Sequence, residues 1–284
     1  MFRKLTPILL ALALVLSACS LHVSVPITQT TGPTTTDRIS IPLPSDATQT
    51  FTLKLSFGAG TLKLSPGAAN LVEGTATYNV QDLKPKVTST GNTVQVEQGN
   101  YHLTGLPDFS NIKNEWDFQL GGVPLDLEIE GGAYTADLAL GGLALTNLTI
   151  RDGASKVNLS FDTPNPSGMN LLRYETGASN VSVTGLANAN FASMEFAGGA
   201  GNYTLDFSGD LQRDASVNIK TGVSNLTLVI PAGIPVQITV EGALANVTHD
   251  SGWSKNGSIY TQTGTGSRLV IVIEIGAGNL TLTR

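Results

Sequence analysis

Gly222-Val-Ser-Asn-Leu-Thr-Leu228 is one copy of a pattern that recurs along the chain: a glycine, a small residue, a variable residue, a polar residue, and an apolar–polar–apolar triplet. Close copies begin at Gly58, Gly153, Gly177, Gly199 and Gly276, and looser copies begin at Gly132 and Gly242. From Gly132 onward the glycines follow one another after 21, 24, 22, 23, 20 and 34 residues. A period near 22 residues is typical of architectures in which similar units stack.

Each unit is predicted to contain two strands that meet at the glycine. In one unit, Ser216-Val-Asn-Ile-Lys220 precedes Gly222 and Leu226-Thr-Leu-Val-Ile230 follows it. Their alternation of apolar and polar residues places alternate side chains on opposite faces of a strand. The glycine permits either a positive φ or a close approach of two backbones. One unit has an apolar face too small to be stable alone, so successive units must stack.

Four copies carry an asparagine at the same position: Asn180, Asn202, Asn225 and Asn279. Stacked asparagines are expected to share side-chain hydrogen bonds along the stacking axis. We therefore predict an all-β protein whose residues 99–284 form a β-solenoid or a solenoid-like stacked sandwich. An ordinary antiparallel sandwich with similar hairpins is the alternative. The longest step, from Gly242 to Gly276, leaves room for an extra hairpin around Trp253 to Tyr260.

Residues 50–98 depart from this pattern and are predicted to form a β meander, with turns at Ser65-Pro-Gly67, Gln81-Asp82 and Gly91-Asn92. The block from Leu53 to Val96 resembles the toast-rack N-terminal domain, an all-β family found in bacterial envelope proteins. The segment Gly141-Gly-Leu-Ala-Leu-Thr-Asn-Leu-Thr-Ile150 is similar to the repetitive β region associated with that domain. The resemblance implies a fold and an envelope location, as in envelope-stress and adhesin-like proteins. It implies no catalytic residues.

The first residues have the features of a secretory leader. Arg3 and Lys4 precede an apolar run from Ile8 to Leu16, which is too short for a transmembrane helix of about 20 residues but suits a signal peptide. The run ends in Leu16-Ser-Ala-Cys19, which resembles the lipobox of bacterial lipoproteins. That resemblance implies removal of residues 1–18 and acylation of Cys19, with palmitate among the lipids. An ordinary signal peptide with an unrelated cysteine is the alternative.

The segment after Cys19 is rich in Thr, Ser, Gln and Pro and has no periodic apolar pattern up to about Gln49. Such a segment buries too little surface to offset its ordering entropy, and prolines stiffen it. The predicted organisation is therefore a lipoprotein signal peptide at 1–18, a lipidated tether at 19–49, a toast-rack-like β domain at 50–98 and a repetitive β domain at 99–284. The tether would hold the folded part outside a bacterial membrane, with the lipid bilayer as a partner.

Composition excludes several classes of function. The chain of 284 residues has a formal charge of −6, with 16 Lys and Arg against 22 Asp and Glu, and loss of residues 1–18 would leave −8. An acidic balance argues against nucleic acid as a partner. The only cysteine is Cys19, so no disulfide within the chain is expected. Nucleophile-elbow, Walker and zinc-ligand patterns are missing, so we predict a protein that is not an enzyme and needs neither cofactor nor metal.

Two features remain as candidate sites. Asp126, Glu128 and Glu130 alternate with apolar residues, which places the three carboxylates on one strand face. Such an acidic stripe could bind Ca²⁺ or act as glycosidase acids, although a solvated strand face explains the same pattern. Trp253 lies in a loop-like segment and is expected to be exposed, which makes it the first candidate for a ligand contact. Trp116 shares a strand face with Phe118 and is expected to be buried.

The leading interpretation is a non-enzymatic, membrane-anchored lipoprotein that serves in interaction, scaffolding or envelope-stress sensing, with an envelope protein as its partner. The alternative is a polysaccharide-binding or adhesive module that recognises a cell-surface glycan through Trp253 and exposed Asn and Thr rows. A third, weaker candidate is a solenoid polysaccharide lyase or hydrolase that uses the acidic stripe.

Overall fold

A long mixed β-sheet of 16 strands, which does not close on itself, makes up the computed structural model of the protein. The structure describes residues 31–43, 46, 48–99, 111–242 and 244–284. The predicted signal peptide and Cys19 lie outside the described residues. Residues 31–101 and 112–284 belong to one compact unit, and the description below concerns that unit alone. The predicted all-β class is confirmed.

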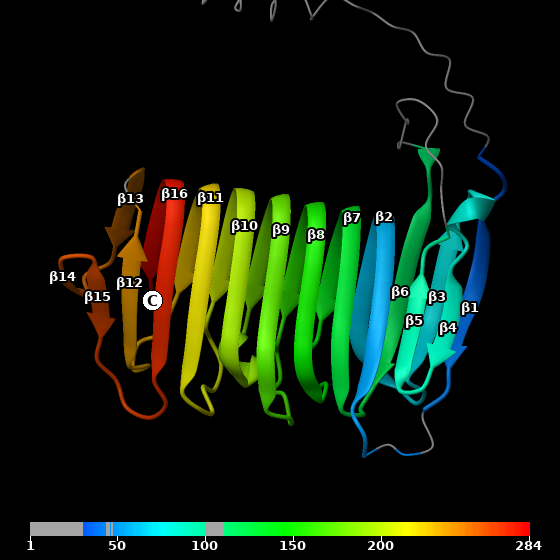
Figure 1. Ribbon diagram of the computed structural model, residues 1–284, viewed down its shortest axis with the longest axis horizontal. Coiled ribbons are helices and arrows are strands. Elements are labelled where there is room, and N and C mark those ends of the chain that lie inside the picture. Colours follow the sequence, from blue (N-terminus) through cyan, green and yellow to red (C-terminus); the bar gives the residue numbers. More distant parts are fainter. Residues whose placement is uncertain (1–30, 44–45, 47, 100–110, 243) are drawn as a thin grey trace, which may run out of the picture. The chain divides into compact units, whose positions relative to one another are not determined.

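Seven long strands lie side by side in the middle of the sheet and run parallel to one another (Figure 1). In spatial order they are β2 (Phe51–Ala68), β7 (Leu125–Ala139), β8 (Leu145–Ser160), β9 (Met169–Thr184), β10 (Phe191–Asp206), β11 (Ala215–Val229) and β16 (Leu269–Thr283). Each strand is one coil of a stack, which confirms the predicted solenoid-like sandwich. The prediction of two strands in each unit is wrong, because one continuous strand passes through the glycine and pairs on both sides of it.

The repeat glycines form a corner where neighbouring backbones come unusually close. A Cβ atom on Gly199 would lie 2.5 Å from the carbonyl oxygen of Gly177, and one on Gly222 would lie 2.7 Å from that of Gly199. Gly276 has the same relation to Gly222, at 2.8 Å. None of these corner glycines has φ in the left-handed region, so the close approach, rather than a positive φ, explains why glycine recurs there.

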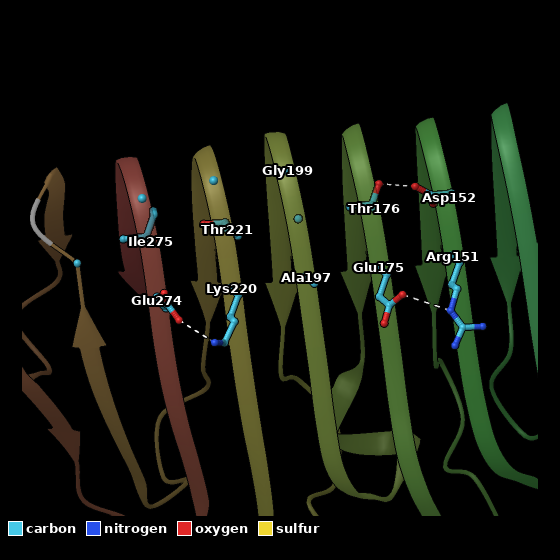
Figure 2. A pocket seen from close by; sticks show the side chains of 14 residues that line it. Arg151, Asp152, Glu175, Thr176, Ala197, Gly199, Lys220, Thr221, Glu274 and Ile275 are labelled. Carbon is cyan, nitrogen blue, oxygen red and sulfur yellow. Dashed lines mark hydrogen bonds and ion pairs between the residues drawn. The ribbon is translucent and has the colours of Figure 1, made fainter.

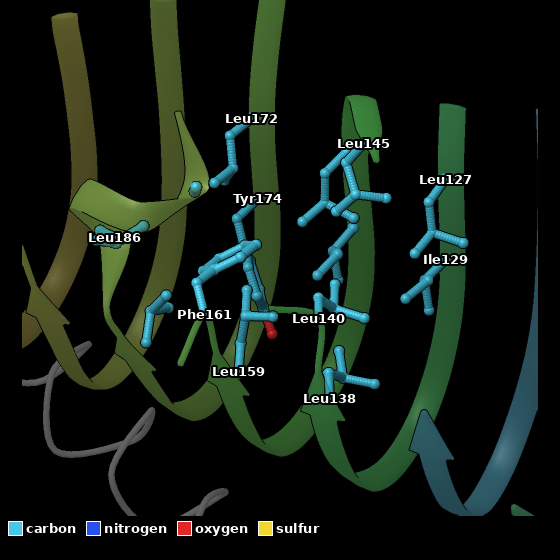
Figure 3. Close-up of a cluster of buried hydrophobic side chains, with 14 of the residues drawn as sticks. Leu127, Ile129, Leu138, Leu140, Leu145, Leu159, Phe161, Leu172, Tyr174 and Leu186 are labelled. Atoms are coloured by element: carbon cyan, nitrogen blue, oxygen red, sulfur yellow. The ribbon is translucent and has the colours of Figure 1, made fainter. Parts of the chain in front are cut away.

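Alternate residues of the coils point inward and form one continuous hydrophobic core. Figure 3 shows Leu127 and Ile129 of β7, Leu159 of β8 and Tyr174 of β9 among the buried side chains. Because each coil contributes side chains from both sides of its corner, one coil covers the core of the next. The burial that a single unit lacks is therefore supplied by its neighbours, as the repeat predicts.

At each end of the stack, one coil is assembled from two shorter strands. Beside β2, the part before Gly58 pairs with β5 (Thr93–Glu97) and the part after it pairs with β6 (Asn114–Gly121). Beside β16, the two parts pair with β12 (Val236–Glu241) and β13 (Leu244–His249). Thus β16 lies between β11 on one side and β12 with β13 on the other, although it comes after all three strands in the sequence.

The remaining strands extend these ends. β3 (Val72–Tyr78) pairs with β6, β1 (Thr35–Ile41) pairs with β3, and β4 (Lys86–Thr90) pairs with β5. β15 (Ile259–Gln262) pairs with β12 and with β14 (Ser254–Asn256). The β14–β15 hairpin confirms the extra hairpin predicted for the 34-residue step. Two short 3-10 helices, η2 (Gln81–Leu83) and η4 (Leu186–Ala189), also occur among the described residues.

The tether predicted for residues 19–49 is wrong over Thr35–Ile41, which form β1. Ile39 and Ile41 are buried, while Arg38 and Ser40 point outward. This alternation is that of a strand, but it is too short to stand out beside the polar residues before it. Antiparallel pairing with β3 supplies the burial that the segment lacks on its own.

The sheet also crosses the boundary predicted between residues 98 and 99. β2 pairs with β5 on one side of that boundary and with β6 and β7 on the other. The turn predicted at Ser65-Pro-Gly67 lies inside β2, where the register shifts between Pro66 and Ala68. The turn at Gly91-Asn92 is confirmed between β4 and β5. Whether residues 50–98 fold separately stays a prediction.

Candidate functional site

The corner glycines divide the outward side of each coil into two faces. We call the outward residues before the corner the first face; on β7 and β11 they include Glu128 and Lys220. The outward residues after the corner are the second face; on the same strands they include Asp137 and Thr227. Because the coils pair in register, residues at equivalent positions form rows across neighbouring strands.

Charged side chains on the first face of the long strands pair between or along neighbouring coils. The Nζ–Oε2 distance is 2.7 Å for Lys54 with Glu128 and 2.8 Å for Lys220 with Glu274. Arg151 contacts Glu175 at 3.2 Å, and Arg173 contacts Glu195 at 2.7 Å. The hydrogen bond that Lys54 donates to Glu128 raises the pKa of Lys54, and the one that Lys220 donates to Glu274 raises the pKa of Lys220. Exposed pairs of this kind contribute little to stability, because water and salt screen them.

The three carboxylates of the predicted acidic stripe do share one face, since Leu125, Leu127 and Ile129 between them are buried. Each, however, has a partner on another strand. Asp126 accepts a hydrogen bond from Asn147 Nδ2 at 3.3 Å, and Glu130 lies 4.0 Å from Arg151. Burial raises the pKa of Asp126. The part of the chain that the structure describes holds no cluster of three or more His, Cys, Asp or Glu suited to a metal ion.

A groove of about 770 Å³ runs along the corner, from β8 to β16 (Figure 2). Arg151, Glu175, Lys220 and Glu274 line its first-face side, and glycines such as Gly199 and Gly222 line the corner. Figure 2 shows the Arg151–Glu175 and Lys220–Glu274 pairs in the same row, with Ala197 between them. Its strongest hydrogen-bonding groups are therefore already engaged with one another.

A polar cluster lies on the inner side of this corner, around Asp152. The carboxylate accepts hydrogen bonds from Tyr174 OH at 2.8 Å, from Tyr134 OH at 3.4 Å and from Thr176 Oγ1. Burial raises the pKa of both tyrosines. Sequence reasoning missed this cluster because its members come from three coils. The available signal was the acid Asp152 at a position where the following copies carry Thr176, Gly198 and Thr221.

A second groove, of about 490 Å³, lies on the second face over β6, β2, β7, β8 and β9; we call it the second-face groove. One of its rows consists, strand by strand, of Asp117, Lys63, Asp137, Asn158 and Ser182. The next outward row contributes only small side chains to the lining of the groove, namely Ser65, Ala139, Ser160 and Thr184, whereas on β6 it carries Gln119. Asn158 Nδ2 donates to Asp137 Oδ1 at 2.9 Å. Within the described residues, Lys63 and Asp117 form no side-chain hydrogen bond and no ion pair within 4.0 Å.

Beyond this groove the second face carries the predicted asparagine ladder, which is confirmed. Asn202 donates to Asn180 at 2.8 Å, Asn225 to Asn202 at 2.9 Å, and Asn279 to Asn225 at 2.7 Å. Asn246 of β13 extends the ladder at 3.5 Å. The neighbouring row presents hydroxyl groups on successive coils, including Ser182, Thr204 and Thr227. No sequence feature identified the second-face groove, because lining residues on different strands are separated by 19 or more positions.

The predicted exposure of Trp253 is wrong. Its side chain is 7% exposed and belongs to the hydrophobic core, so the indole is not a surface platform. The apolar interior of a stacked fold needs a cover at its last coil, and the segment between β13 and β14 supplies Trp253 for this. Its role as a ligand contact stays a prediction without support from its position. Trp116 is 1% exposed, which confirms its predicted burial. The structure does not bring Trp253 and the acidic stripe together.

In the described part of the chain, no helix has the length and apolar character needed to cross a bilayer. A search of curated proteins found no significant match to this chain. The family described as the N-terminal domain of toast_rack, DUF2154, matches residues 30–184.

The chain is similar to several solved structures at low sequence identity. A "putative cell adhesion protein" from Clostridium sporogenes is 18% identical with a TM-score of 0.50, and the match covers 88% of this chain and 99% of that one. A "putative adhesin" from Bacteroides fragilis is 10% identical with a TM-score of 0.35, covering 88% and 97%. A "putative lipid binding protein" from Parabacteroides distasonis is 11% identical with a TM-score of 0.40, covering 88% and 97%.

Proposed function

Because the chain belongs to the family of the N-terminal domain of toast_rack, we propose that it is an extracytoplasmic, adhesin-like interaction module of a bacterial envelope, anchored to a membrane by lipid on Cys19. In this proposal the protein is not an enzyme. Its stacked β body holds a binding surface at a distance from the bilayer. The description of the Clostridium sporogenes structure as a cell adhesion protein supports a role of this kind.

One observation carries the proposal: the outward side chains are arranged in rows that repeat from coil to coil. Hydrogen bonding in register and the close contact of the corner glycines hold these rows in a fixed geometry. A surface of this kind presents many similar groups along one direction, which suits contact with an extended or repetitive partner. Each carboxylate of the acidic stripe has a partner on another strand: Lys54 for Glu128, Arg151 for Glu130 and the Asn147 amide for Asp126. We infer that these contacts between strands stabilise the surface rather than prepare the carboxylates for bond cleavage.

Lipid anchoring is tested by metabolic labelling with palmitate in a bacterial host. We expect label in the wild-type chain and in a Ser20→Ala control, and none in Cys19→Ala. A Cys19→Ala chain labelled as strongly as the wild type would refute the anchor. Fractionation of the same cells should place the wild type with membranes and Cys19→Ala in the soluble extracytoplasmic fraction.

The absence of catalysis is tested in cells that lack the protein and are challenged with cell-wall stress. If loss of the protein changes survival, we expect rescue by the wild type and by an Asp126→Asn, Glu128→Gln double variant alike. Rescue by the wild type alone, with the double variant folded and present at equal amount, would favour an enzyme that uses the acidic stripe. If survival is unchanged, the purified full chain is assayed for turnover of an acidic polysaccharide, and we expect none. Turnover by the wild type that is lost in the double variant would refute the proposal that the protein is not an enzyme.

A further inference from the structure

The two outward faces differ in how their charges are used. On the first face most charged groups of the long strands form ion pairs with one another, as for Lys54 with Glu128 and Lys220 with Glu274. In the second-face groove, Lys63 is in register between Asp117 and Asp137, yet it lies more than 4.0 Å from the carboxylate oxygens of both. Within the described residues, Lys63 and Asp117 are therefore available to a ligand, whereas Asp137 already accepts a hydrogen bond from Asn158 on Oδ1 and offers its second oxygen.

The shape of the second-face groove suits an extended chain. It crosses five neighbouring strands, which at about 4.8 Å for each step span about 19 Å. The small side chains of Ser65, Ala139 and Ser160 leave room above the sheet. Larger polar side chains such as Lys63 and Asp117 stand in the row beside them. A chain of several sugar rings can lie across these strands, parallel to the rows, so that each ring contacts side chains of one row or of both.

The chemistry of the groove narrows the class of ligand. Carboxylate oxygens accept hydrogen bonds from hydroxyl groups, an ammonium group donates to oxygens, and serine and threonine hydroxyls do both. Adjacent hydroxyls on a pyranose ring each offer a donor and an acceptor, and so can pair with the carboxylates, the ammonium group and the hydroxyls of the groove. Two aspartates against one lysine disfavour a polyanion. An added peptide strand would need an open strand edge, whereas the backbones of β2, β7 and β8 are paired on both sides.

From these observations we infer that the second-face groove binds an uncharged, hydroxyl-rich glycan chain through Lys63, Asp117 and Asp137. The inference rests on the proposed role as an interaction module and assigns its ligand class. Within the described part of the chain, the hydroxyls of Thr204 and Thr227 form no hydrogen bond, and they continue one row of the groove along the stack. A longer glycan therefore meets equivalent groups on further coils, which increases the contact without a new type of site.

Calorimetric titration of the purified full chain in detergent micelles tests the inference. The probes are β-1,4-linked hexamers of glucose and of N-acetylglucosamine, with polygalacturonate as the polyanion. We expect at least one neutral hexamer to bind more tightly than polygalacturonate. A Lys63→Ala, Asp117→Ala double variant should bind it at least tenfold more weakly, a change equivalent to about 1.4 kcal/mol. The matched control is Lys156→Ala, which removes an exposed lysine of the same face outside the groove and should bind like the wild type.

A second variant, Ser160→Tyr, fills the groove without removing a charge and should also weaken binding at least tenfold. Circular dichroism of each variant verifies that the fold is kept. The inference is overturned if neither hexamer binds, if polygalacturonate binds more tightly, or if both groove variants bind like Lys156→Ala. Palmitate labelling of Cys19 does not depend on the groove, so the anchored interaction module and its glycan site can fail separately.

Discussion

Replacing Gly199 by alanine tests the close contact of coils at the corner. The new Cβ atom would lie 2.5 Å from the carbonyl oxygen of Gly177, whereas ordinary contacts begin near 3.4 Å. The backbones of β9 and β10 must therefore separate by about 0.9 Å at this point. Separation weakens the ladder hydrogen bonds on either side, each worth about 1 kcal/mol, and overpacking by one methyl group typically costs about 1–3 kcal/mol. We expect a loss of about 2–3 kcal/mol in the free energy of unfolding.

The matched control is Gly122→Ala, because a Cβ at Gly122 meets nothing within 4 Å and the residue has no left-handed φ. This variant should be as stable as the wild type or up to about 1 kcal/mol more stable, since alanine restricts the unfolded chain. Urea unfolding followed by circular dichroism gives the midpoint and the slope for all three proteins. If Gly199→Ala and Gly122→Ala unfold at the same urea concentration, the corner does not require glycine and the steric argument is wrong.

Three further predictions concern the ladder, the first strands and the cover of the core. Asn225→Ala removes two amide hydrogen bonds of the ladder and should cost about 1 kcal/mol in urea unfolding, whereas Asn218→Ala, on the first face of the same strand, should cost almost nothing. Burial and the hydrogen bond to Asp37 raise the pKa of Tyr78 to about 12, so the stabilisation by its neutral hydroxyl is complete below pH 10 and is lost as the pH rises through 12. The difference in unfolding free energy between wild type and Tyr78→Phe should therefore shrink over that range, and a constant difference would contradict this. Trp253→Ala should destabilise the fold by about 3 kcal/mol in the same assay and leave glycan binding unchanged, and weaker binding at unchanged stability would restore Trp253 as a contact residue.

The stacked architecture could be predicted because its cause is local. A glycine every 22 residues or so, with alternation on both sides, describes each coil without reference to the others. Asn180 and Asn202 could be aligned because equal positions in stacked units must be neighbours. The same reasoning could not show that the strand continues through the corner, since a glycine is equally compatible with a turn.

The order of the last coils could not be read from the repeat. Gly242 and Gly276 both begin copies of the pattern, and only the folded chain shows that Gly276, not Gly242, stacks on Gly222. The burial of Trp253 depends on that order, because the segment that carries it covers the end of the stack. β1 escaped prediction for a related reason: its two buried isoleucines have meaning only beside β3.

The groove on the second face lay beyond sequence reasoning for a different reason. Lys63, Asp117 and Asp137 are ordinary charged residues in their own strands, and nothing in the local sequence of any of them suggests a ligand. Their significance comes from the register that makes them neighbours and from the small residues beside them. The first face has ion pairs between strands and the second-face groove has none among its described residues. This difference can be seen only when the pairing of the strands is known.

The position of β16 has a consequence for synthesis on the ribosome. β11 is synthesised well before β16, and β12 to β15 emerge in between. β11 pairs with β10 on one edge, but its other edge pairs with β16. Until β16 emerges, β11 therefore has a long unpaired edge, and β12 and β13 have no coil on which to pack. Exposed edges of this kind promote aggregation. Loss of residues 263–284, by a premature stop or by proteolysis, would therefore leave the edge of β11 unpaired. We expect such a truncated chain to aggregate or to be degraded.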